Sequence, residues 1–84
     1  MSLVIHNILE SVEVGEYLKE RSLVDRYKKA KAYILGGHFG SVDFKIREPK
    51  SKKIYQFRIS QKYRCYSYVE EENLIVFYIS DHQQ

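Results

Sequence analysis

Three runs of strand-forming residues occupy the last third of the chain. Residues 55–59 alternate apolar side chains with Gln56 and Arg58, residues 63–69 form a second run, and residues 74–79 are continuously apolar. Short polar turns separate the runs, so we expect an antiparallel meander of three strands. A continuously apolar run is typical of a strand that is covered on both faces.

The alternation of side chains also predicts the register of the first hairpin. A three-residue loop places Phe57 opposite Cys65 on an apolar side, and Arg58 opposite Arg64 on the other side. A two-residue turn would instead oppose Arg58 and Cys65, mixing charge with core. Opposed like charges destabilise a strand pair by ~0.2–1 kcal/mol unless an anion lies between them. The pattern therefore predicts an anion site at the two arginines, with Tyr66 on the same side.

The first half of the chain predicts a short strand and two helices. The strand is expected at residues 3–5 and the first helix at about residues 9–20. A second helix should begin at Ser22 as N-cap, with Asp25 three residues later, and should end at the following pair of glycines. Its apolar positions, spaced for one helix face, are Leu23, Tyr27, Ala30 and Ile34.

These elements predict an α+β fold, with the N-terminal strand and both helices packed on one face of the meander. The chain has 84 residues, one proline (Pro49), and no repeat or linker, so residues 1–84 are expected to form one domain. A single cysteine excludes an internal disulfide, there is no long apolar run, and we expect no secretory leader. We therefore expect a cytoplasmic protein without a membrane partner.

The basic side chains are concentrated in the middle of the chain. Residues 1–25 carry a net charge of −3, residues 26–64 carry +10 and residues 65–84 carry −4, within a total of +3. Aromatic and branched side chains run through the central block, which argues against a disordered basic tail. The charge is therefore expected on folded surface, where it either forms an ordinary solvated face or meets an anionic partner.

The order of these features resembles the RelE/ParE toxin superfamily. The resemblance lies in YQFRI at residues 55–59, YR at 63–64, an acidic turn, and a final apolar strand that ends in His82. It extends over residues 39–82. The resemblance implies a toxin of a type II toxin–antitoxin pair, with helices on one face of a twisted antiparallel sheet.

RelE-like members cleave messenger RNA on the ribosome without a metal, and the resemblance implies that activity here. In such cleavage an RNA 2′-hydroxyl attacks the adjacent phosphate, which requires cations for the developing charge and groups that move protons. Arg58 and Arg64 suit the first requirement and His82 suits the second. The residues that would contact RNA are Lys50, Lys52, Lys53 and Tyr66.

Other readings of the same residues stay open. A ParE-type member would inhibit DNA gyrase without nuclease chemistry, and a degenerate member would keep only antitoxin binding. In every toxin reading an acidic antitoxin is the expected partner of the basic block. No cofactor or metal is expected, because His6, His38 and Cys65 lack the spacing of a metal site. Among central acids, Glu48 is the nearest candidate for a general base.

Overall fold

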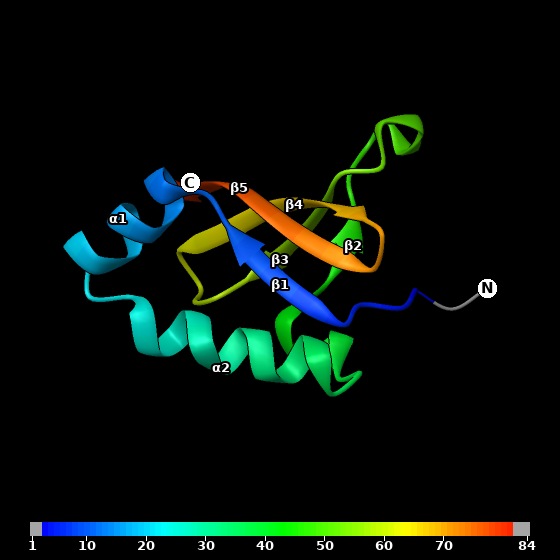
Figure 1. The fold of residues 1–84 in the computed structure, drawn as a ribbon. Coiled ribbons are helices and arrows are strands. Elements are labelled where there is room, and N and C mark those ends of the chain that lie inside the picture. Colours follow the sequence, from blue (N-terminus) through cyan, green and yellow to red (C-terminus); the bar gives the residue numbers. More distant parts are fainter. Residues whose placement is uncertain (1–2, 82–84) are drawn as a thin grey trace.

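A five-stranded mixed sheet forms the centre of the fold (Figure 1). The computed structural model describes residues 3–81. The strands are β1 (Asn7–Glu10), β2 (Lys45–Ile46), β3 (Tyr55–Arg58), β4 (Tyr63–Glu70) and β5 (Asn73–Asp81). The helices are α1 (Val12–Glu20) and α2 (Val24–Leu35), with short 3₁₀ turns η1 (Phe39–Val42) and η2 (Lys50–Lys52).

The strand order is β1-β5-β4-β3-β2. Strands β3, β4 and β5 pair antiparallel in chain order, β2 pairs antiparallel with β3, and β1 pairs parallel with β5. The predicted α+β class is confirmed, but the prediction of a three-stranded sheet is wrong. Strand β2 has only two residues, and β1 pairs with β5, which is distant in sequence.

The N-terminal strand differs from its prediction in its residue range and in its location relative to the sheet. It spans Asn7–Glu10 rather than residues 3–5, and it lies at the edge of the sheet, not on its face. Parallel pairing from Asn7↔Asn73 to Glu10↔Val76 determines these bounds. Helix α1 then begins at Val12, because the Ser11 side chain accepts a hydrogen bond from the Val14 amide at 3.1 Å.

Helix α2 follows the predicted apolar spacing but not the predicted start. Leu23 and not Ser22 is the N-cap residue, and no side chain caps this end. Ser22 adopts the left-handed conformation, with φ of 56°, in the turn between the helices. At the other end the helix stops before two glycines, and Gly37 takes a φ of 81° that favours glycine. The predicted inward positions are confirmed as buried: Leu23, Tyr27, Ala30 and Ile34.

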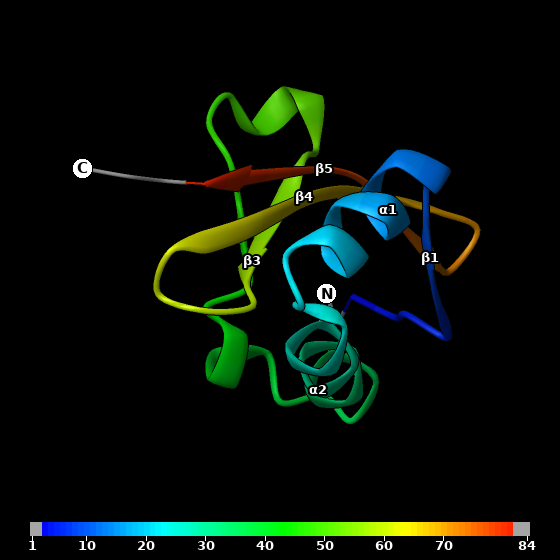
Figure 2. The same ribbon diagram turned by 90° about the vertical axis from the view of Figure 1, so that its left-hand side faces the viewer.

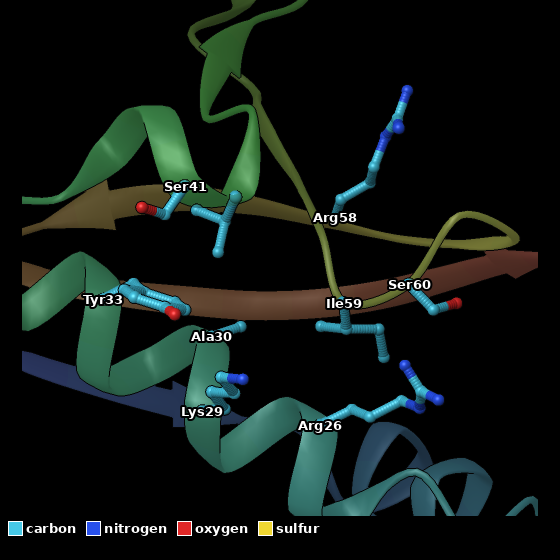
Figure 3. Close-up of a pocket in the computed structure, with 9 residues that line it drawn as sticks. Arg26, Lys29, Ala30, Tyr33, Ser41, Arg58, Ile59 and Ser60 are labelled. Carbon is cyan, nitrogen blue, oxygen red and sulfur yellow. The ribbon is translucent and has the colours of Figure 1, made fainter.

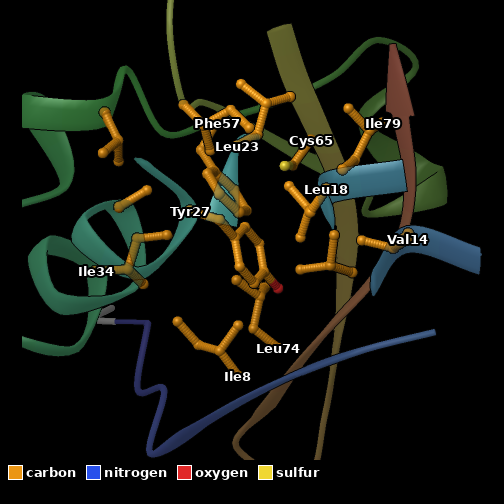
Figure 4. Close-up of a cluster of buried hydrophobic side chains, with 14 of the residues drawn as sticks. Ile8, Val14, Leu18, Leu23, Tyr27, Ile34, Phe57, Cys65, Leu74 and Ile79 are labelled. Atoms are coloured by element: carbon orange, nitrogen blue, oxygen red, sulfur yellow. The ribbon is translucent and has the colours of Figure 1, made fainter. Parts of the chain in front are cut away.

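The core lies between the helices and one face of the sheet (Figure 4). Phe57, Cys65 and Leu74 are fully buried there, and side chains from both helices pack among them. Figures 1 and 2 show both helices on one side of the sheet, and neither helix covers the opposite face. We call this opposite face the open face. It is where the polar members of the alternating strands must lie.

A β-bulge interrupts the pairing of β4 with β5. Tyr66 pairs with Tyr78 and the next residue, Ser67, pairs with Val76, so Phe77 is an extra residue in β5. The bulge reverses the inward and outward alternation along β5. Leu74 and Val76 are buried before it and Ile79 is buried after it. Phe77 and Tyr78 are consequently both turned outwards.

Within residues 3–81, no helix is both long and apolar enough to cross a membrane.

Candidate functional site

Arg58 and Arg64 lie directly opposite each other on β3 and β4. The neighbouring pair, Phe57 and Cys65, points into the core, where both side chains are fully buried. Because side chains alternate along a strand, both arginines project from the open face. The predicted register and the predicted pairing of the two arginines are confirmed.

The two arginines have unequal surroundings. Oδ2 of Asp43 is 3.9 Å from Nη2 of Arg58, and the same oxygen is 3.5 Å from Nζ of Lys45. Arg64 forms no ion pair with any acid in the described part of the chain. One carboxylate therefore faces more cations than it can neutralise, and the site keeps a net positive charge.

Asp43 reaches this position through a local turn. It follows η1 and takes a left-handed conformation, with φ of 53° and ψ of 46°, which an aspartate tolerates better than most residues. The sequence does not predict this role of Asp43, because nothing in its neighbourhood along the chain indicates a contact with β3. Nε of Arg58 is buried and has no hydrogen-bond partner among residues 3–81.

Tyr66 lies beside the arginine pair but is a covered side chain. Its ring stacks on Tyr78, with centroids 5.8 Å apart and planes at 22°, and the Arg47 guanidinium lies 4.7 Å from its centroid. Only 8% of Tyr66 is exposed, whereas 56% of Tyr78 is exposed. Tyr78 is thus the ring of this pair that a ligand reaches. Arg47 is a third guanidinium of the site that the sequence analysis missed.

The three lysines predicted to contact RNA lie in a projecting loop. Lys50 and Lys52 belong to η2, and Lys53 follows in a left-handed conformation. Figure 1 shows this loop rising from the sheet on the side opposite α2. The three side chains are exposed and form no ion pair within residues 3–81. None of the three belongs to the β3–β4 strand pair that carries the two arginines.

His82, the predicted proton-transfer residue, lies outside the described residues. The last described residue, Asp81, pairs with Tyr63, and Ser80 pairs with Arg64. The chain therefore leaves β5 next to the strand position that carries Arg64. An ion pair of 3.6 Å between Lys62 and Asp81 ties this end of β5 to the β3–β4 loop.

A separate basic pocket lies between α2 and the β3–β4 loop (Figure 3). It has a volume of about 280 Å³, and Arg26 and Lys29 extend into it from α2. Arg58 also lines this pocket, although most of its side chain extends away from α2. The pocket and the arginine pair therefore adjoin each other at Arg58.

The remaining reactive side chains do not form a catalytic cluster. Burial raises the pKa of the Cys65 thiol to about 12, so it is protonated at neutral pH and is not a nucleophile. Nδ1 of His6 pairs with Glu72 at 3.0 Å. Among residues 3–81, no three histidine, cysteine or acidic side chains come together as a metal site.

The geometry suits an anion with several oxygens. Two opposed guanidinium groups can donate hydrogen bonds in parallel to a phosphate, and the third, Arg47, adds positive charge nearby. No family model matches the sequence, and no curated protein matches it significantly. The assignment of a function therefore depends on the residues of the site.

Proposed function

We propose that this protein is the toxin of a type II toxin–antitoxin system of the RelE/ParE superfamily, and that it cleaves messenger RNA without a metal. The observation that supports the proposal best is the opposed pair of Arg58 and Arg64 on the open face, with Asp43 as the only carboxylate in ion-pair contact with it among residues 3–81. A pair of like charges is unfavourable in a sheet unless an anion binds. A phosphodiester supplies that anion.

In the proposed reaction the 2′-oxygen of one nucleotide attacks its own 3′-phosphate. The bond from phosphorus to the 5′-oxygen of the next nucleotide breaks, leaving a 2′,3′-cyclic phosphate and a free 5′-hydroxyl. Arg58 and Arg64 stabilise the negative charge that grows on the phosphate oxygens. His82 takes the proton from the 2′-hydroxyl or gives a proton to the leaving 5′-oxygen, and solvent water carries the other proton.

Asp43 is a positioning residue in this scheme. Its carboxylate, 3.9 Å from Nη2 of Arg58, holds that guanidinium while leaving Arg64 uncompensated. Lys50, Lys52 and Lys53 contact the RNA backbone away from the cleaved bond, because they project beyond the sheet. An acidic antitoxin would cover the arginines and the basic central block and so inhibit the toxin.

The test uses purified protein and an RNA that contains one ribonucleotide in an otherwise 2′-deoxy strand. We expect cleavage at the ribonucleotide in the presence of EDTA, with a cyclic phosphate on the upstream product. Arg64→Gln should reduce the rate by roughly 100-fold or more. The matched control is Lys28→Gln, which removes one exposed charge on α2 and should cleave normally.

Two further assays test the proposal: tightly controlled expression in cells, with growth and messenger integrity as readouts, and cleavage by purified protein in the presence of translating ribosomes. Arrested growth with cleaved messenger supports the proposal, as does cleavage by purified protein that requires translating ribosomes. Intact messenger together with inhibited supercoiling by DNA gyrase would identify a ParE-type toxin instead. Normal growth with soluble, folded protein would indicate a member that binds its antitoxin but has lost toxicity.

A further inference from the structure

Three aromatic side chains are exposed on the open face that carries the arginine pair. The exposed fractions are 40% for Tyr68, 41% for Phe77 and 56% for Tyr78. Large aromatic side chains are usually buried in part by neighbouring elements, because their exposure to water is unfavourable. Phe77 and Tyr78 also line a pocket beside Tyr17 of α1. A group of three exposed rings, two of them at a pocket, indicates a binding surface.

The β-bulge produces this group. Without the extra residue in β5, Phe77 and Tyr78 would point to opposite faces of the sheet. With it, Phe77 contacts Tyr68, at 5.9 Å between ring centroids, and Tyr78 stacks on Tyr66 at 5.8 Å. Bulges often re-aim side chains beside functional sites. Here the bulge presents two consecutive rings on the face that carries the arginines.

The register places the rings in rows beside the cations. One row across the sheet contains Ser80, Arg64 and Arg58. The adjacent row contains Tyr78, Tyr66 and Gln56. Adjacent rows on one face are two residues apart along each strand, which is about 7 Å. The distance from an anion bound by the arginines to the exposed Tyr78 ring is therefore about the length of one nucleotide.

The Tyr78 ring is held in place before a ligand arrives. Tyr66 stacks against it, and the Arg47 guanidinium lies over the Tyr66 ring, 4.7 Å from the ring centroid. Stacking on a fixed ring costs less conformational entropy than ordering a free one. A second flat group can continue the stack on the exposed side of Tyr78.

We propose that Tyr78, flanked by Phe77 and Tyr68, stacks an unpaired base of a single-stranded RNA whose phosphate lies between Arg58 and Arg64. This inference rests on the proposed function and names the form of RNA that the site takes. Alternating phosphates and flat, unpaired bases match a row of cations beside a row of rings. A duplex would not fit, because its bases are already stacked.

The test compares two uncleavable probes of equal length and charge. One is a 2′-O-methyl oligoadenylate, and the other is an abasic strand with the same sugar-phosphate backbone. We expect Tyr78→Ala to weaken binding of the adenylate strand roughly 5- to 100-fold in fluorescence anisotropy and to leave the abasic strand unaffected. Tyr78→Phe retains the ring and should bind both strands like the wild type. The control Leu35→Ala removes an exposed apolar side chain from α2.

The outcomes separate this inference from the proposed function. Equal affinity of Tyr78→Ala and wild type for the adenylate strand, with cleavage intact, would overturn the stacking role alone. Equal losses on both probes would also overturn it, because the ring would then act on the backbone site. Failure of the wild type to bind either probe would overturn the stacking role, while the cleavage assays with and without ribosomes decide the proposed function separately. A wild-type dimer in sedimentation that Tyr78→Ala dissociates would identify a second copy of the chain as the occupant instead.

Discussion

Arg58 and Arg64 face each other across β3 and β4, yet only Arg58 has a carboxylate partner, Asp43 at 3.9 Å. The uncompensated member, Arg64, is paired on its other side with Ser80 of β5. The two arginines should therefore respond differently to substitution. Loss of Arg64 removes an unfavourable charge contact, whereas loss of Arg58 also leaves Asp43 without one of its two basic partners.

Arg64→Gln is expected to preserve or increase stability while it slows the proposed cleavage. Relief of the opposed charges should raise the free energy of unfolding by up to about 1 kcal/mol. Urea unfolding of the wild type, Arg64→Gln and Lys28→Gln measures the effect. A loss of stability of more than about 1 kcal/mol in Arg64→Gln would show that this side chain is structural.

Inorganic phosphate is expected to stabilise the folded protein through the same pair. At a concentration ten times its Kd, a ligand that binds only the folded state adds about 1.4 kcal/mol to the free energy of unfolding. Thermal unfolding in phosphate, against chloride at equal ionic strength, measures this gain. The gain should disappear in Arg64→Gln and persist in Lys28→Gln. An identical gain in both variants would place the bound phosphate elsewhere, for example in the pocket beside Arg26.

Stability is expected to fall in alkaline solution because of Cys65. Burial raises its pKa from 9.0 to about 12, so between these pH values the unfolded thiol loses its proton while the folded thiol keeps it. Since the unfolded state then binds fewer protons, the contribution is fully present below pH 9 and is lost as pH rises toward 12. It amounts to about 1 kcal/mol between pH 9 and pH 10. Cys65→Ala should lose less stability than the wild type over this interval in denaturant unfolding.

Tyr27→Phe is expected to destabilise the protein by about 1–2 kcal/mol. The Tyr27 hydroxyl donates a hydrogen bond of 2.8 Å to Oε1 of Glu10, which ties α2 to β1. Burial, together with this hydrogen bond, raises the pKa of Tyr27. Urea unfolding measures the loss, with Tyr33→Phe as control, because the Tyr33 hydroxyl donates no side-chain hydrogen bond within residues 3–81. Equal effects of the two substitutions would contradict the assignment.

Much of the fold is encoded in local patterns. The apolar spacing of α2 predicts which side chains it buries, since residues three and four apart share one helix face. The alternation in β3 and β4 predicts the Arg58–Arg64 pair, because a one-residue slip would bury a charge. The residues at which helices begin are less well encoded. Serine is a common N-cap residue, but the tight turn after α1 places Ser22 in a left-handed conformation, so Leu23 is the N-cap of α2.

The sequence by itself determined the α+β class, the inward face of α2 and the pairing of Arg58 with Arg64. Only the tertiary structure decided that Asp43 contacts Arg58, that Arg47 covers Tyr66, and that a bulge turns both Phe77 and Tyr78 outwards. Periodicity and hairpin register arise from residues that are close in the chain. The other contacts join segments brought together by packing, and no local pattern carries that information.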